Sequence, residues 1–163
     1  MKAKAIRVQR HGGPEVLELV EVDVGDPGPD EVRIRQHAIG LNYIDTYYRT
    51  GLYTAPLPHG IGNEAAGVVE AVGSNVKFLK EGDRVAYPQS PVGAYADVRV
   101  MPAATVVKIP AKLSFEQAAP EAEDDEDGES GGRVARAHAS RGARLKQAPG
   151  GGEDLFDESA PAP

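Results

Sequence analysis

Residues 60–73 read GIGNEAAGVVEAVG, and they place one ionisable side chain, Glu64, among glycines and alanines at the start of an apolar run. As a string, the first part of this stretch matches the dinucleotide fingerprint G-x-G-x-x-[GA]. That fingerprint binds pyrophosphate only when a buried strand leads into it and a helix follows it. Here residues 54–59, TAPLPH, form a proline-broken loop, and residues 67–73, GVVEAVG, have the composition of a strand. The match to the fingerprint is therefore accidental, and the stretch predicts a turn that enters a β-strand.

Short alternating segments recur over the first 119 residues, with turn signals rich in Gly, Pro and Asp between them. In EVRIR, Val32 and Ile34 point one way and the charges the other, as in a strand with one face in solvent. The predicted strands are residues 4–8, 17–22, 32–39, 68–72, 84–87, 94–100 and 106–109. Residues 42–49, NYIDTYYR, break this pattern and predict a short helix that ends at Gly51. Evenly spaced short strands predict a mainly β domain, either a small barrel or a sandwich.

The composition changes abruptly at residue 120. Residues 1–119 carry 13 Lys or Arg against 14 Asp or Glu, whereas residues 120–163 carry 5 against 11 and only four large apolar residues. Such a segment cannot bury enough surface to offset the entropy of ordering it. We therefore predict a folded domain over residues 1–119 and a disordered acidic tail over residues 120–163. Charge runs of this kind are ordinary in solvated chain, so no nucleic-acid partner is expected.

Several functional classes are excluded by what the sequence lacks. It contains no cysteine, which excludes disulfides and thiolate metal sites and fits a reducing compartment. The N-terminal residues lack the apolar core of a signal peptide, and no run is long enough to span a bilayer. We expect a cytoplasmic protein without a membrane partner. The histidines His11, His37, His59 and His138 are scattered, so no metal site is predicted.

Tyrosines cluster in the predicted helix and just after it. Four of the six, Tyr43, Tyr47, Tyr48 and Tyr53, fall within eleven residues. Tyr43 and Tyr47 are four apart and share one helix face. Flat amphipathic rings beside the carboxylate of Asp45 make a platform for a planar ligand. The alternative is that the rings only cover the end of the barrel.

Five motifs then identify a family. They are HGGPEVLEL (11–19), AIGLNYIDTYYRTGLY (38–53), GIGNEAAGVVEAVGSNV (60–76), GDRVAYPQSPVGAYADV (82–98) and IPAKLSFEQAA (109–119). In this order they resemble the zinc-free NADPH:quinone oxidoreductases, the zeta-crystallin-like branch of the medium-chain dehydrogenase/reductase superfamily. The resemblance implies a GroES-like β-barrel of the alcohol-dehydrogenase N-terminal type with short helices. It also implies NADPH as cofactor and a small-molecule quinone as substrate.

The resemblance also assigns roles to individual residues. In zinc-dependent relatives, a cysteine stands at the position of Asn42 and the histidine of a Gly-His-Glu motif stands at that of Asn63. Amides are poor zinc ligands, so the resemblance implies a metal-free site, in which Glu64 remains as a hydrogen-bonding group of the cleft floor. The catalytic residues expected are Asn42, Asp45, Tyr53 and Glu64. The residues expected to contact the nicotinamide end of NADPH are Tyr43, Ile44, Asp45, Thr46 and Tyr47.

The resemblance stops at residue 119. The family continues past LSFEQAA into a Rossmann domain that carries most of the NADPH contacts, whereas this chain enters PEAEDDEDG. Neither glycine run of residues 120–163 follows a buried strand, so we expect no Rossmann domain in them. We expect a truncated form that is inactive alone, with a tail translated in another reading frame or from a misjoined exon.

Two other functions stay open. One is a non-enzymatic GroES-like binding module with an acidic interaction tail. The other is a different zinc-free reductase, such as an enoyl reductase acting on activated double bonds. The sequence predicts neither the acceptor nor the oligomeric state.

Overall fold

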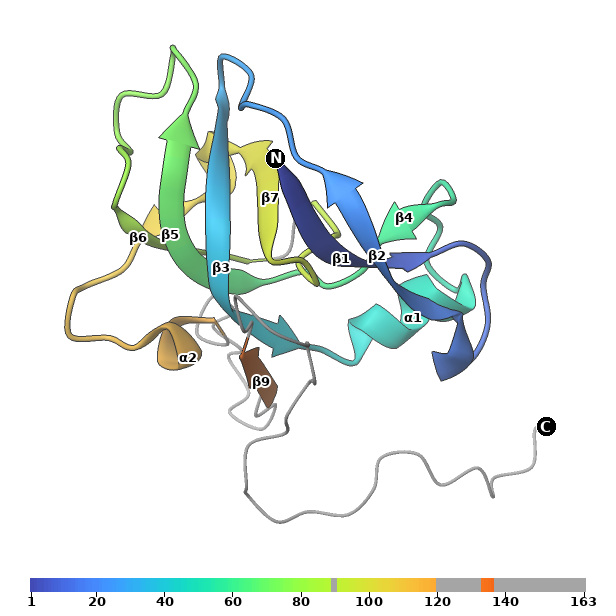
Figure 1. Cartoon of the computed structure of the whole chain (residues 1–163). Helices are drawn as coiled ribbons and strands as arrows, with labels where there is room; N and C mark the ends of the chain where they lie inside the picture. The colour runs from blue at the N-terminus through green and yellow to red at the C-terminus, as the bar shows by residue number, and fades with distance from the viewer. Residues whose placement is uncertain (89–90, 120–132, 137–163) are drawn as a thin grey trace.

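In a computed structural model, residues 1–88, 91–119 and 133–136 are described, and they form two antiparallel sheets around an apolar core (Figure 1). The strands are β1 Lys2–Val8, β2 Leu17–Asp23, β3 Glu31–Leu41, β4 His59–Gly60, β5 Ala65–Val72, β6 Arg84–Tyr87, β7 Val98–Pro102, β8 Val107–Lys108 and β9 Arg133–Arg136. The helices are α1 Ile44–Thr50 and α2 Phe115–Ala118, with 3₁₀ turns at Pro14–Val16 and Ala103–Thr105. One sheet has the order β2-β1-β4, and the other has the order β7-β3-β5-β6-β8. No helix among the described residues is long and apolar enough to cross a bilayer.

Strand β3 is the longest strand of the larger sheet. It pairs with β5 along almost its whole length, and on its other side with β7 near its start and β9 near its end. Val32 and Ile34 are fully buried, which confirms the predicted alternation. Each such side chain contributes roughly 1.5–3 kcal/mol by leaving water. The mainly β fold class with short helices, predicted from the sequence, is correct.

The predicted strand at residues 94–100 is wrong in its first half. Only Val98–Pro102 forms a strand, and residues 94–97 cross from one sheet to the other. The crossing is held by long-range bonds: the amide N of Ile6 donates to the Tyr95 carbonyl at 2.7 Å, and the Gln36 Nε2 donates to the carbonyls of Ala94 and Ala96. Alternation in the local sequence carries no signal of these bonds, because their partners lie 58 or more residues away.

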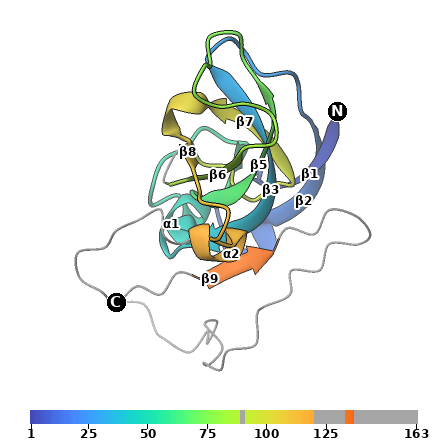
Figure 2. The ribbon, with the colours of Figure 1, turned by 90° about the vertical axis from the view of Figure 1, so that its left-hand side faces the viewer.

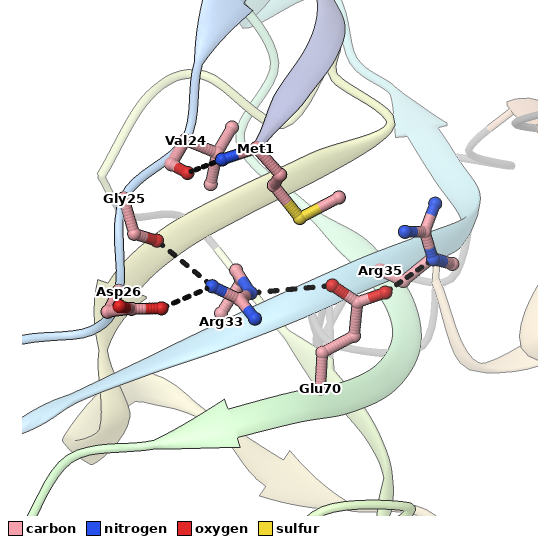
Figure 3. A network of polar contacts seen from close by, with 7 residues as sticks. All are labelled: Met1, Val24, Gly25, Asp26, Arg33, Arg35 and Glu70. Carbon is pink, nitrogen blue, oxygen red and sulfur yellow. Dashed lines mark hydrogen bonds and ion pairs between the residues drawn. The ribbon is translucent and has the colours of Figure 1, made fainter.

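The outer face of β3 carries the charged half of the alternation (Figure 3). The Arg35 Nε donates to Glu70 Oε1 at 2.5 Å, and Arg33 lies 3.4 Å from the other oxygen of Glu70. Arg33 also donates to Asp26 at 2.9 Å and to the Gly25 carbonyl at 3.2 Å. These two arginines are thus neutralised by carboxylates on neighbouring segments.

Helix α2 is fixed to the barrel wall. Its Ser114 cap forms a reciprocal capping box with Gln117, and α2 packs on the small side chains of Ala38, Ala66 and Ala86. A second contact comes from Arg84. Its guanidinium carbon lies 4.3 Å from the centroid of the Phe115 ring, and Arg84 also donates to the Leu113 carbonyl.

Strand β9 falls within residues 120–163, where the sequence predicts disorder. Its residues 133–136 pair antiparallel with residues 38–41 of β3, and β9 lies close to α2 (Figure 2). The part of β3 beyond its pairing with β7 offers the open edge along which these four residues pair. The remaining predictions for the tail, disorder and the absence of a Rossmann domain, fall on residues outside the described ones.

The turn before β6 gives a prediction for acid stability. Asp83 is 10% exposed in its side chain and accepts from Lys80 Nζ at 2.8 Å and Lys108 Nζ at 2.9 Å. These bonds hold the pKa of Asp83 well below its ordinary value. A lowered folded-state pKa stabilises the protein above the unfolded-state pKa, and this contribution is lost progressively as the pH falls below about 5. We therefore expect Asp83→Asn to lower the melting temperature at pH 7, by a margin that shrinks steadily as the pH falls from about 5 toward 2.

The matched control is Asp26→Asn, since the Asp26 side chain is 95% exposed. Melting scans of the three proteins between pH 2 and pH 7 would test the prediction. A gap between Asp83→Asn and wild type that stays constant over this range would contradict it.

Candidate functional site

Asp45 lies at the centre of a buried polar cluster under α1. Asp45 is only 4% exposed, although it lies in the first turn of the helix. The Asn63 Nδ2 donates to Asp45 Oδ1 at 2.7 Å, the Tyr95 hydroxyl donates to Oδ2 at 2.8 Å, and the backbone N of Asn42 donates to Oδ2 at 3.1 Å. The carboxylate therefore joins the end of β3, the start of α1, the loop before β5 and the crossing segment.

Burial dominates the electrostatics of this cluster. It raises the pKa of Asp45, against the lowering effect of the hydrogen bonds from Asn42, Tyr95 and Asn63. It also raises the pKa of Tyr95 far above its ordinary value, and the neighbouring Asp45 charge adds to this shift. The Tyr95 hydroxyl consequently stays protonated and acts as a donor toward Asp45.

Glu64 occupies the core side of the same region and is 2% exposed. Its side chain lies directly on the Cα of Gly40, where any Cβ would overlap the carboxylate. The glycine at position 40 therefore leaves the space that the Glu64 side chain occupies. Burial raises the pKa of Tyr87 as well as that of Tyr95, and the Glu64 charge adds to both shifts. The buried Tyr87 hydroxyl donates in turn to the Gln36 side-chain oxygen.

The tyrosine rings form the outer layer of the site. Tyr43 is 72% exposed and meets Tyr47 edge-on, with ring centroids 5.3 Å apart. Tyr53 is 44% exposed and lies 5.3 Å from Tyr47 and 5.6 Å from Tyr48, centroid to centroid. The backbone N of Tyr53 donates to the Tyr47 carbonyl at 3.1 Å, so the chain after α1 folds back onto the helix. The result is a set of partly exposed aromatic rings at α1 and just after it, whereas Asp45 of the same helix is buried.

The structure places the predicted site residues in two layers. The outer layer holds Tyr43, Tyr47 and Tyr53, and Thr46 supports it by donating from its hydroxyl to the Tyr43 carbonyl at 2.7 Å. The inner layer holds Asp45 and Glu64. Ile44 begins α1, and Asn42 lies between β3 and α1, joined to Asp45 through its backbone N.

Sequence reasoning missed Tyr95, Tyr87 and Gln36 as members of the inner layer. Tyr95 is 50 residues from Asp45, and Tyr87 is 51 residues from Gln36. The one available signal was that both tyrosines fall inside the motif GDRVAYPQSPVGAYADV.

The groups at the site that could bind a metal ion are carboxylate and hydroxyl oxygens and amide groups. In the described part of the chain, no three His, Asp or Glu side chains converge as metal ligands. The Asn63 amide donates to Asp45, so its orientation serves the carboxylate cluster.

Comparison with known proteins places this geometry in a family. The alcohol dehydrogenase GroES-like domain family matches residues 28–111. The chain is 56% identical over 118 residues to the quinone oxidoreductase of Pseudomonas aeruginosa, covering 72% of this chain and 36% of that protein. The crystal structure of Escherichia coli quinone oxidoreductase complexed with NADPH superposes with a TM-score of 0.70 at 52% identity, over 71% of this chain and 36% of that one.

A third relative has a different activity in its name. The 2-haloacrylate reductase of a Burkholderia species is 42% identical over 113 residues, covering 67% of this chain and 34% of that protein. The chain thus spans about a third of the length of the relatives it matches. Through its matched residues, the chain belongs to the alcohol dehydrogenase GroES-like domain family and is a homologue of the quinone oxidoreductases.

Proposed function

We propose that residues 1–119 form the quinone-facing and nicotinamide-facing domain of an NADPH-dependent quinone reductase. The observation that carries the proposal is the two-layered site: accessible tyrosine rings on α1 lie above a buried Asp45–Asn63–Tyr95 cluster. Similarity to quinone oxidoreductases over about 118 residues supports it. The relatives are about three times as long as the matched region, so the activity of the whole protein is part of the proposal.

The residues of the outer layer fit the ring end of NADPH. Flat aromatic faces that are 72% and 44% exposed, at Tyr43 and Tyr53, suit a planar ring. The residues that would hold this end are Tyr43, Ile44, Thr46 and Tyr47, and Asp45 would position them from the buried side of α1. When bound, NADPH supplies a hydride to the acceptor.

The chain's own residues position the reactants. Asn42 and Tyr53 would line the acceptor pocket, where an amide or hydroxyl can donate a hydrogen bond to the developing quinol oxygen. Asp45 and Glu64 are at most 4% exposed, so they would act through their neighbours. Through its hydrogen bonds, Asp45 would fix the start of α1 and thereby the positions of the Tyr43 and Tyr47 rings.

A second candidate is reduction of an activated carbon–carbon double bond. Similarity to a 2-haloacrylate reductase favours it, because an acrylate, like a quinone, places its double bond in conjugation with a carbonyl group. The same hydrogen-bond donors would then stabilise an enolate oxygen instead of a quinol oxygen.

A chimera would test the proposed function. Residues 1–119 of this chain replace the corresponding residues of the Pseudomonas aeruginosa enzyme, and NADPH oxidation is followed with 1,4-benzoquinone and with 2-chloroacrylate. We expect benzoquinone turnover within about tenfold of the parent. In the chimera, Tyr47→Ala should lower kcat/KM at least tenfold, roughly the loss of one well-placed aromatic contact.

Tyr48→Ala is the matched control. Tyr48 contacts Tyr53, so it belongs to the same tyrosine cluster, but it is outside the predicted NADPH set. A folded chimera that reduces neither acceptor would refute the proposal, and a preference for 2-chloroacrylate would favour the second candidate. The 163-residue chain assayed by itself should give no turnover above its own Tyr47→Ala variant. Clear turnover by it would show that these residues suffice.

A further inference from the structure

A hollow of about 260 Å³ lies on another part of the barrel, lined by none of the predicted site residues. Its lining comes from β1, the end of β2, β7, Gly60 and the loop at Gly93. Its apolar lining includes Val22, Val98 and Val100. Three charged residues, Arg7, Arg99 and Asp23, are also part of it.

Both guanidinium groups reach one point of this hollow, where the backbones of Gly60 and Gly93 touch. A Cβ built on Gly60 would lie 3.5 Å from Arg7 Nη1 and 2.7 Å from the Gly93 Cα. A Cβ built on Gly93 would lie 3.7 Å from Arg99 Nη2. Arg7 also shares its strand face with the buried Ala3 and Ala5, since alternate residues of β1 point the same way. The two cations therefore lie at the same end of the hollow.

Neither cation is neutralised by a carboxylate in the described part of the chain. Arg99 donates to the Pro91 carbonyl at 2.8 Å and to the Tyr87 hydroxyl at 3.4 Å, both of them neutral acceptors. Arg7 has no ion pair within 4 Å among the described residues. Arg33 and Arg35 differ in this respect, because Glu70 contacts both of them (Figure 3).

Two carboxylates near the hollow could compete for these arginines. Asp23 lies opposite Lys2 in the β1–β2 register and pairs with it at 3.0 Å. Lys2 is five residues along β1 from Arg7, a separation of roughly 16 Å. Glu18 lies opposite Arg7 in the same register but is exposed and makes no ion pair with it. The arginine end of the hollow is thus left cationic, whereas the Asp23 carboxylate at its other end is paired with Lys2.

We propose that this hollow binds a small organic acid, with its carboxylate between Arg7 and Arg99 and its apolar tail along the valines of β2 and β7. A guanidinium binds a carboxylate through charge-assisted hydrogen bonds, and the valines supply surface that a tail can cover. The volume suits about eight non-hydrogen atoms, if each takes roughly the 30 Å³ of a water molecule. A six-carbon straight-chain acid has this size.

Titration of the full ¹⁵N-labelled chain with sodium hexanoate at constant ionic strength tests the proposal. We expect saturable shifts of the Gly60, Gly93 and Val98 amide signals, with a Kd of about 1 mM for a ligand of this size. Hexan-1-ol, which has the same chain without the charge, should shift these signals at least tenfold more weakly. Arg7→Gln should weaken hexanoate binding about tenfold, the expected loss of one charge-assisted bond.

Two variants serve as controls. Arg10→Gln removes the same charge from an exposed residue outside the hollow and should leave binding unchanged. Glu18→Gln removes the competing carboxylate and should tighten binding.

Three results would overturn the proposal: no saturable shift at these glycines, equal shifts with hexan-1-ol, or equal losses in Arg7→Gln and Arg10→Gln. Sulfate matching hexanoate in both affinity and dependence on Arg7 would also overturn it, since the tail would then contribute nothing. Hexanoate is neither a quinone nor a dinucleotide. Failure here therefore leaves the chimera test of the reductase activity unaffected.

Discussion

Replacement of Asp45 by alanine should lower the free energy of unfolding by about 3 kcal/mol, because it leaves the buried donors of Asn63, Tyr95 and Asn42 without their acceptor. Urea denaturation followed by circular dichroism would measure this loss. Asp26→Ala is the control, since the Asp26 side chain is 95% exposed and its ion pair with Arg33 is worth about 1 kcal/mol or less. Equal losses in the two variants would show that the cluster does not hold α1.

The pH dependence of this effect has a definite sign. The folded-state pKa of Asp45 is raised, so the folded state binds the proton more tightly than the unfolded state does. The wild type therefore gains stability at this site as the pH falls from 7 toward about 4, near the ordinary pKa of aspartate. The free energy of unfolding of the wild type minus that of Asp45→Asn should therefore become more positive as the pH falls over that range, in the direction opposite to the Asp83 effect. A change toward more negative values would contradict the raised pKa.

Gly40→Ala is the second change with a large expected effect. Its new methyl group would overlap the Glu64 side chain, which is 2% exposed and would have to move within the core. Overpacking of this kind costs roughly 1–3 kcal/mol, and displacement of a buried charge adds to it, so we expect a loss of about 3 kcal/mol or more. In the chimera, kcat/KM should fall at least tenfold, because the inner layer under α1 shifts with Glu64.

Two variants make this result specific. A Cβ on Gly25 meets nothing within 4 Å, so Gly25→Ala should change the free energy of unfolding by less than about 0.5 kcal/mol. Truncation of the overlapping side chain in the double variant Gly40→Ala/Glu64→Ala should recover part of the loss. A double variant less stable than the sum of the two single effects would show that the overlap is not the cause.

Local sequence predicted most of the strands and the short helix. Alternation at Val32 and Ile34 identified the core strand because its period of two is set by the pleat itself. The end of α1 was predicted from Gly51, whose φ of 84° is the left-handed conformation that favours glycine. Both features depend on neighbours within a few residues.

The inner layer of the site could not be predicted in the same way. Asp45 was chosen from its motif, but its burial depends on Asn63 and Tyr95, which arrive from 18 and 50 residues away. The failed half of the predicted strand at 94–100 has the same origin, because Gln36 binds the carbonyls of Ala94 and Ala96 and thereby diverts that segment between the sheets. Periodicity reports which way a side chain points, and it carries no information on which distant group it meets.

The mounting of α2 on alanines 38, 66 and 86, clamped by Arg84 over Phe115, has an architectural consequence. Small side chains allow the helix to sit close to the wall, and the clamp resists its rotation. The chain therefore leaves α2 from a fixed point on the barrel wall.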